Sequence, residues 1–298
     1  KPASRYQEAT YDIQQTYLYH YKPTWEPELE IFDERRTAIR MKDWYDFKDP
    51  RQFYYGTYTL ARARMQETAQ ADFDFVEERG LAEAYPEAVK KLALEVLLPL
   101  RHVAWGSNMN NSFMCAYGYG TAITQPCLYH AMDQLGIAQY LTRLGLLVAD
   151  PDALEAAKQA WLTEPRWQEL RRLVEDTFVL SDWFELYVAQ NLVLDGLLYP
   201  LIYQHLDKAL TAQAGATISM LVRFQSEWFT ETSKWVDASV KTAVAESADN
   251  KALVSRWYQA WRGRAAKALE PLARHALGAG APMAELVKSL DARAAKLG

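Results

Sequence analysis

Residues 182–206 read DWFELYVAQNLVLDGLLYPLIYQHL, and this stretch decides the fold. Asp182 stands three residues before Glu185, which is the spacing of a capping box that opens a helix. From Trp183 onward, large apolar side chains occur on nearly every side of the helix instead of along one stripe. Other elements must surround such a helix, so the stretch predicts a central helix inside an all-helical core.

The rest of the chain also follows helical spacing, and strand-type alternation is convincing nowhere. Long helices are predicted near 86–117, 121–148, 182–206 and 211–245. Further helices are predicted near 59–79, 250–276 and 282–296, and two shorter ones begin at Asp150-Pro151 and at Glu164-Pro165. The long helices would measure ~40 to 50 Å, which is the scale of a ferritin-like (ribonucleotide-reductase-like) bundle. Residues 149–181 are long enough to form the crossover that this bundle requires.

The composition is that of a globular protein and argues against several classes of function. The 298 residues carry a formal charge of −5 without a dense Lys/Arg cluster, so nucleic-acid binding is not expected. The most apolar run, Leu192 to Ile202, is too short to span a bilayer and contains Asp195. Cys115 and Cys127 are too few for a disulfide framework, and no signal peptide opens the chain. We therefore expect a cytoplasmic protein without a membrane span.

Residues 1–57 differ from the rest because they lack a sustained helical period and are rich in aromatic residues and proline. We divide the chain into this extended N-terminal arm and a helical domain at 58–298. The arm either lies on its own domain or packs against a partner, since Tyr, Trp and Phe are enriched at interfaces. The candidate interface residues are Tyr17, Tyr19, Tyr21, Trp25, Trp44, Tyr45, Phe53, Tyr54 and Tyr55.

A ferritin-like di-iron site needs a Glu from each of two helices and a Glu-x-x-His from each of the other two. The chain has five histidines, and none has a carboxylate three or four residues before it or a ligand four residues after it. Cys127-x-x-His130 is one isolated pair, which we interpret as structural. The sequence therefore predicts no metal site in this chain.

Other catalytic motifs are equally absent from the sequence. It contains no Gly-x-Gly-x-x-Gly after a strand, no P-loop and no Gly-x-Ser-x-Gly elbow. The central helices do carry polar residues, which we expect to pair mostly as buried amides that hydrogen-bond across helices. These polar residues are Asn108, Asn110, Asn111, Gln134, Gln190, Asn191, Asp195 and Glu227.

One stretch resembles a known family. Residues 46–58, DFKDPRQFYYGTY, together with the aromatic arm and the helices that follow, resemble the β subunit of bacterial multicomponent monooxygenases. The phenol hydroxylase oxygenase component is the nearest resemblance, with toluene and methane monooxygenases as more distant ones. The likeness extends from about residue 10 to about residue 275.

This resemblance implies a non-catalytic structural β subunit in an (αβγ)2 hydroxylase that uses NADH and O2. The α subunit would carry the di-iron centre, and this chain would hold no cofactor. A γ subunit, a second αβγ protomer, a reductase and a small regulatory protein would be the other partners. Of the two readings of the arm, the resemblance favours packing against a neighbouring subunit.

The resemblance also implies two degenerate ligand motifs. Residues 133–137 align with the α-type Asp-Glu-x-Arg-His, so Gln134 and Ile137 stand where metal ligands would be. In FQSEWFTETSKWVD, residues 224–237, two registers compete. Either Glu227 and Thr230 occupy the Glu and His positions, or Trp228 and Glu231 do, and both registers lack the histidine.

Two alternatives stay open at this point. One is a stand-alone ferritin-like enzyme with an atypical metal or ligand site near Cys127, His130, Gln134 and Glu227. The other is a binding module whose bundle core holds an apolar small molecule.

Overall fold

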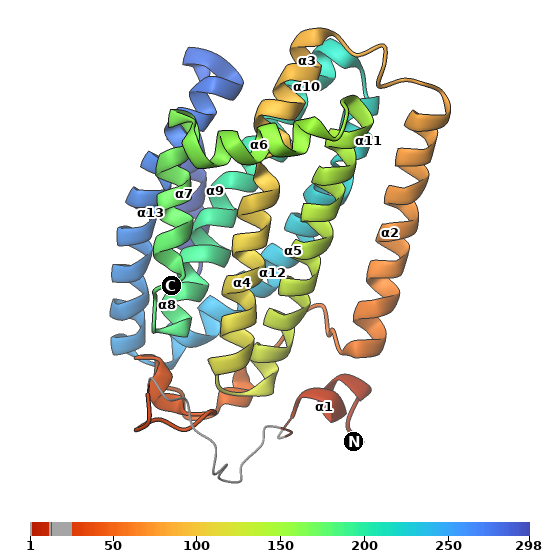
Figure 1. Ribbon diagram of the computed structural model, residues 1–298. Coiled ribbons are helices and arrows are strands. Elements are labelled where there is room, and N and C mark those ends of the chain that lie inside the picture. Colours follow the sequence, from red (N-terminus) through yellow and green to blue (C-terminus); the bar gives the residue numbers. More distant parts are fainter. Residues whose placement is uncertain (1, 12, 14–25) are drawn as a thin grey trace.

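The structure is a computed structural model that describes residues 2–11, 13 and 26–298, and every regular element in these ranges is helical. Figure 1 shows long helices running side by side, with one short helix crossing them. The α-helices are α1 (Arg5–Thr10), α2 (Tyr55–Glu78), α3 (Glu87–Leu92), α4 (Leu100–Tyr117), α5 (Thr121–Val148), α6 (Asp152–Thr163), α7 (Pro165–Thr177), α8 (Trp183–Tyr187), α9 (Asp195–Pro200), α10 (Asp207–Ala214), α11 (Thr217–Leu221), α12 (Arg223–Glu246), α13 (Ala248–Leu277) and α14 (Met283–Ala294). The π-helical segments are η3 (Ala93–Leu97), η4 (Val188–Leu194) and η5 (Leu201–Leu206), and the 3-10 turns are η1 (Glu34–Arg36), η2 (Trp44–Asp46) and η6 (Gly278–Gly280).

The central helix lies where the sequence predicts it. The segments α8, η4, α9, η5 and α10 follow one another without a break, and every residue from Leu186 to Tyr199 is buried. Asp182 caps its start by accepting hydrogen bonds from the backbone N–H groups of Phe184 and Glu185. With α4, α5 and α12 around it, this helix forms the core of a ferritin-like bundle, and the predicted fold class is confirmed.

One predicted boundary is wrong. The central helix continues past residue 206 to Ala214, because Leu210 keeps an apolar side chain turned toward the core. The helix ends where Gly215 adopts a φ of +78°, a left-handed conformation that glycine adopts without strain. The following long helix therefore begins at Arg223, after the short α11, and not near residue 211.

The crossover at 149–181 contains two helices, as predicted. In Figure 1, α6 crosses the face of the bundle and α7 then runs along it. Helix α7 packs against α13 and α4, so the crossover covers one side of the central helix. Among the described residues, no helix combines the length and apolarity that a membrane span requires.

The N-terminal segment is less extended than the sequence suggests. It contains α1 and two 3-10 turns, and α2 begins at Tyr55, inside the segment predicted to be irregular. Trp44 is buried and packs against the rings of Phe47, Tyr119 and Trp183. The part from 26 to 54 thus lies against one end of the bundle, at the bottom of Figure 1.

Gly120 lies where Trp44 of the N-terminal segment packs closely against the start of α5. Its φ is +86°, and a Cβ built there would lie 3.0 Å from the Cβ of Trp44. We expect Gly120→Ala to destabilise the chain by about 1–3 kcal/mol, measured by urea denaturation.

Gly136 provides the matched control for this substitution. It lies within helix α5, and a Cβ there would meet no atom within 4 Å. We expect Gly136→Ala to stabilise the chain by about 0.5–1 kcal/mol. Equal effects of the two substitutions would contradict the close packing of the N-terminal segment at Gly120.

Candidate functional site

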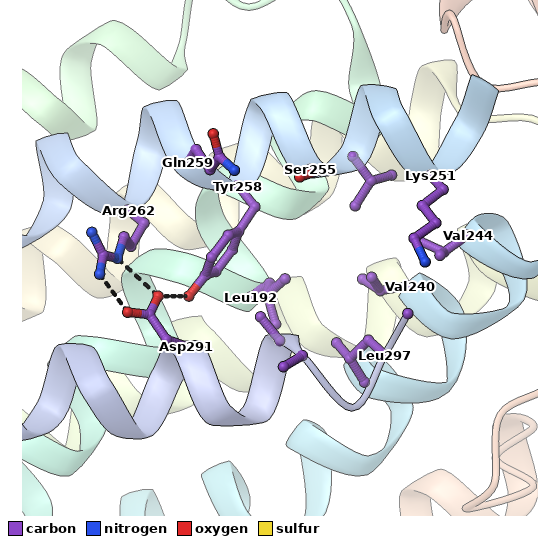
Figure 2. Close-up of a pocket in the computed structure, with 14 residues that line it drawn as sticks. Leu192, Val240, Val244, Lys251, Ser255, Tyr258, Gln259, Arg262, Asp291 and Leu297 are labelled. Atoms are coloured by element: carbon purple, nitrogen blue, oxygen red, sulfur yellow. Dashed lines mark hydrogen bonds and ion pairs between the residues drawn. The ribbon is translucent and has the colours of Figure 1, made fainter. Parts of the chain in front are cut away.

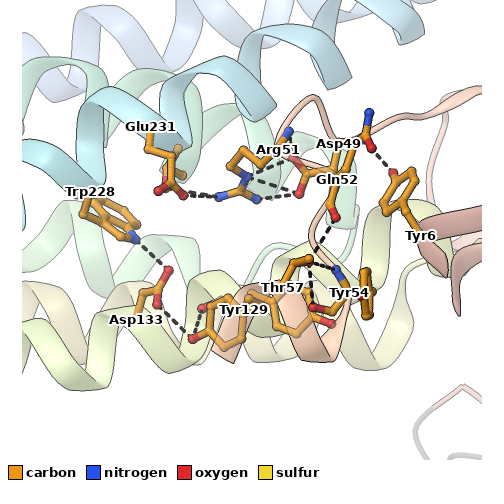
Figure 3. A network of polar contacts seen from close by, with 12 residues as sticks. Tyr6, Asp49, Arg51, Gln52, Tyr54, Thr57, Tyr129, Asp133, Trp228 and Glu231 are labelled. Atoms are coloured by element: carbon orange, nitrogen blue, oxygen red, sulfur yellow. Dashed lines mark hydrogen bonds and ion pairs between the residues drawn. The ribbon is translucent and has the colours of Figure 1, made fainter. Parts of the chain in front are cut away.

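The side chain of Asp133 lies at the centre of a buried ion network. Its carboxylate accepts hydrogen bonds from the Tyr58 hydroxyl at 2.9 Å, from Arg62 Nε at 2.7 Å and Arg62 Nη2 at 2.8 Å, and from Trp228 Nε1 at 2.8 Å. Figure 3 shows the Trp228 ring pointing its nitrogen at this carboxylate. Asp133, Tyr58 and Trp228 are all buried. The charge of Asp133 is therefore compensated by side chains of this chain alone.

Arg62 joins Asp133 to a second carboxylate. It donates from Nη1 to Glu231 Oε2 at 3.1 Å and from Nη2 to Glu231 Oε1 at 3.0 Å. Arg51 Nη1 lies 3.6 Å from Glu231 Oε1, while its Nη2 pairs with Asp49 at 2.9 Å. Figure 3 shows Arg51 between Asp49 and Glu231. Together with the bonds of Arg62, these contacts link the loop at 49–51 with α2, α5 and α12. Burial and the adjacent Asp133 carboxylate both raise the pKa of Tyr58, so this phenol is a hydrogen-bond donor.

A second polar cluster lies deeper in the bundle. His130 Nε2 lies 3.5 Å from Asp195 Oδ2 and 3.4 Å from the Ser107 hydroxyl. Gln190 donates to Asp195 Oδ1 at 2.8 Å. All four side chains are buried. Burial raises the pKa of Asp195, against the lowering effect of its contacts with His130 and Gln190.

Amide pairs continue this cluster across two helices, as the sequence predicts. Asn110 Nδ2 donates to Gln190 Oε1 at 2.9 Å, and Asn111 and Asn191 exchange reciprocal bonds of 3.0 and 2.9 Å. Asn108 instead donates to the Ala131 carbonyl at 2.8 Å. These bonds fix the register of α4 against both η4 and α5.

Glu227 does not belong to this set, and its inclusion among the core polar residues is wrong. It lies on the exposed side of α12, where a charged carboxylate keeps its hydration.

The structure places the expected ligand positions as follows. Gln134 donates from Nε2 to the Tyr199 hydroxyl at 3.0 Å, and Ile137 is buried in the apolar core. On α12, Trp228 points into the bundle, whereas Glu227 and Thr230 are exposed. Of the two competing registers, only the one with Trp228 and Glu231 directs both side chains to the network around Asp133.

These residues do not fit a di-iron centre. Among the described residues, no group of three or more His, Cys, Asp or Glu side chains could hold a metal ion. Asp133 is already saturated by donors, and Glu231 is paired with two arginines.

The atypical site considered above also fails to assemble. Burial raises the pKa of the Cys127 thiol, which opposes its ionisation to the thiolate that binds metals. Glu227 lies on the exposed face of α12 and so points away from the buried His130 and Gln134.

The candidate interface residues fall into three groups. Tyr17, Tyr19, Tyr21 and Trp25 lie outside the described residues. Trp44 and Phe53 are buried within the chain, so their rings offer no surface to a partner. Tyr55 is 75% exposed, and Tyr45 and Tyr54 are partly exposed.

An exposed apolar stripe on α4 and α5 was not recognised in the sequence. Its members are Trp105, Met109, Leu128, Met132 and Leu135, which are between 43% and 51% exposed. The stripe consists of one row of side chains on each helix. The hydrogen bond from Asn108 of α4 to the Ala131 carbonyl of α5 places these two rows at the same height along the bundle. Spacings of three and four residues were visible in the sequence, but they do not distinguish an outward apolar row from an inward one.

The fold and its filled core define a helical bundle of the ferritin-like class. Within this class, the chain belongs to the methane/phenol/alkene hydroxylase family, whose model matches residues 25–247. The resemblance to this family seen in the sequence is thereby confirmed.

Individual relatives agree with this assignment. The chain is 48% identical over 300 residues to the phenol 2-monooxygenase oxygenase component DmpL of Pseudomonas sp. (strain CF600), covering 100% of this chain and 90% of the relative. It is 27% identical to the hydroxylase component subunit beta of the toluene-4-monooxygenase system of Ectopseudomonas mendocina, covering 80% of this chain and 75% of the relative. The crystal structure of xenon-pressurised phenol hydroxylase from Pseudomonas sp. OX1 matches with a TM-score of 0.95 and 42% identity, covering 100% of this chain and 91% of that one.

Removal of Arg62 tests the charge compensation at Asp133. We expect Arg62→Ala to cost about 3–5 kcal/mol of unfolding free energy, because it leaves a buried carboxylate without its counter-charge. The double variant Arg62→Met/Asp133→Leu should recover part of this loss, because it removes the uncompensated charge but leaves the buried Trp228 indole without its acceptor. The control is Arg274→Ala, which removes an exposed pair with Glu270 and should change stability by only about 0.5 kcal/mol. A loss at Arg62 as small as that at Arg274 would argue against the network.

The raised pKa of Asp195 predicts how the stability of the chain depends on pH. Its pKa is raised on folding, so the folded state holds this proton more tightly than the unfolded state does. The stability contributed by this proton is present below the ordinary Asp pKa of about 4 and is lost as pH rises through the folded pKa. Asp195→Asn removes this loss and keeps an oxygen that accepts from Gln190. The stability of the variant relative to the parent chain should therefore rise in urea denaturation as the pH is raised above the ordinary Asp pKa of about 4, and a flat or falling difference would contradict the assignment.

Proposed function

We propose that this chain is the non-catalytic, structural subunit of the hydroxylase component of a multicomponent phenol- or toluene-type monooxygenase. One observation carries the proposal: the inward positions of the two ligand motifs hold Gln134, Ile137 and Trp228, and the adjacent Asp133 is neutralised by Arg62. A protein that organised two irons would need carboxylates and imidazoles at such positions. The relatives of this chain are the oxygenase component of phenol 2-monooxygenase and the beta subunit of a toluene-4-monooxygenase hydroxylase.

The proposal assigns catalysis to a partner. A related α subunit would hold the di-iron centre and select the aromatic substrate, and the complete hydroxylase would be an (αβγ)2 assembly. A reductase and a small regulatory protein would dock on this complex. We propose a cytoplasmic location, which rests on the cysteine content of the sequence.

The apolar stripe on α4 and α5 is the surface that we assign to the α subunit. Trp105 is 51% exposed and Met109, Met132 and Leu135 are similarly open, although such side chains are usually covered in a folded protein. Aromatic residues and methionine are enriched at the centres of protein interfaces, while acidic residues are depleted there. Helix α4 contains no acidic residue, and Asp133, the one acidic residue of α5, is buried. A second helical bundle with its own apolar face is a partner of matching shape and chemistry.

The proposal is tested by co-expressing the neighbouring hydroxylase subunits and analysing the metal content of each separated chain. We expect stoichiometric iron in the larger chain and none in this one. Leu135→Asp should weaken co-purification of the larger chain about tenfold or more, because it places a charge in the buried interface. Ala260→Asp, on the exposed side of α13, is the matched control and should leave assembly unchanged.

Two outcomes would contradict the proposal. Stoichiometric iron in this chain alone would show a metal site of its own. Hydroxylase activity of this polypeptide without any other subunit would show that catalysis does not reside in a partner.

A further inference from the structure

A pocket of about 600 Å³ lies between α12, α13, α14 and the last residues of the chain, and none of its lining residues belongs to the network around Asp133. Its volume is within the ~300–1,000 Å³ that small-molecule sites occupy in proteins. The floor is formed by buried apolar side chains from three different elements. They are Leu192 of η4, Val240 of α12, Val254 of α13 and Leu297 near the end of the chain.

The polar groups stand along one wall of the pocket. Lys251, Ser255, Tyr258, Gln259 and Arg262 follow one another at helical spacing on α13. Lys251 and Arg262 are therefore ~16 Å apart along the helix axis, at about 1.5 Å per residue. Figure 2 shows the Lys251 side chain beside Val244 at one end of the pocket and Arg262 at the other.

The two cations at these ends are not equivalent. Arg262 donates from Nε to Asp291 Oδ1 at 2.9 Å and from Nη2 to the other oxygen, and the Tyr258 hydroxyl donates to Asp291 at 2.7 Å. The charge of Arg262 is therefore already compensated, as Figure 2 shows. Among the described residues that line the pocket, only Asp291 has an acidic side chain, and Arg262 holds it in place.

Lys251 is the cation that stays available. Among the described residues, no carboxylate lies within ion-pair distance of its ammonium group, which is exposed at the rim. A lysine ammonium acts as a single point charge and suits a monovalent anion. The apolar floor beside it suits a hydrocarbon or aryl body. In small-molecule sites the apolar lining buries the body of the ligand, and a few polar groups fix its orientation.

We propose that this pocket binds an amphiphilic carboxylate, with the carboxylate on Lys251 and the apolar body over Leu192, Val240 and Val254. This binding does not depend on the proposed function, since the pocket lies within one chain. Leu192 belongs to η4, which also carries Gln190 and Asn191, so a ligand would contact the helix that orders the polar core.

The test is isothermal titration calorimetry of the purified protein, in whatever assembly it forms, with octanoate and with 1-octanol. Lys251→Gln should weaken octanoate binding about tenfold or more, the loss expected for one charge-assisted contact, and should leave 1-octanol within about twofold. Ala294→Trp places an indole in the pocket from half-buried Ala294 and should weaken both ligands. Lys241→Gln removes an exposed lysine that does not line the pocket and should leave both ligands unchanged.

Three results would overturn the proposal. These are the absence of saturable octanoate binding, octanoate binding that Ala294→Trp leaves unchanged, and equal losses of octanoate and 1-octanol binding in Lys251→Gln. The first would leave the pocket without this class of ligand. The second would place the ligand elsewhere on the protein, and the third would show that Lys251 does not bind the carboxylate. The circular dichroism spectrum of each variant establishes that it is folded.

Discussion

The pairing of Arg62 with Asp133 is the constraint on which the rest of the structure depends. A carboxylate inside a helical bundle needs a compensating charge, which either a metal ion or a cationic side chain can supply. Here the guanidinium of α2 supplies it, and the Trp228 indole and the Tyr58 hydroxyl complete the hydrogen bonding of the carboxylate. Because Arg62 also holds Glu231, one side chain ties α2, α5 and α12 together and completes a polar core built from protein groups.

The amide pairs have a second consequence, because they orient α4 and α5. Asn110 and Asn111 must face η4 to meet Gln190 and Asn191. Turning these amides inward leaves Trp105 and Met109 on the outer side of the same helix, and Asn108 sets the level at which α5 continues that row. The same orientation of α4 therefore buries the amide pairs and exposes the apolar stripe. That arrangement is the physical basis for assigning the stripe to a partner subunit.

Several elements could be predicted because their signals are local. The cap at Asp182, the all-round apolar helix after it and the amides within the central helices were all visible in the sequence. The predicted end of the central helix was wrong because its apolar face continues through Leu210 until Gly215. Glu227 was misplaced because a step of one residue rotates a helical side chain by about 100°, so the neighbouring Trp228 points inward instead.

The sequence by itself determined that this is an all-helical bundle without a helical histidine–carboxylate pair, and its resemblance to the hydroxylase family implied that Gln134 and Ile137 stand where a di-iron motif would carry its ligands. Helical periodicity and ligand spacing are properties of neighbours a few residues apart, so no tertiary information is needed to read them. Only the tertiary structure decided which charges meet. Arg62 is separated from Asp133 by 71 residues and from Glu231 by 169, and no spacing rule connects positions so far apart. It likewise decided which apolar rows are covered and that no carboxylate of the described residues reaches Lys251, since these depend on how the packed helices are rotated about their axes.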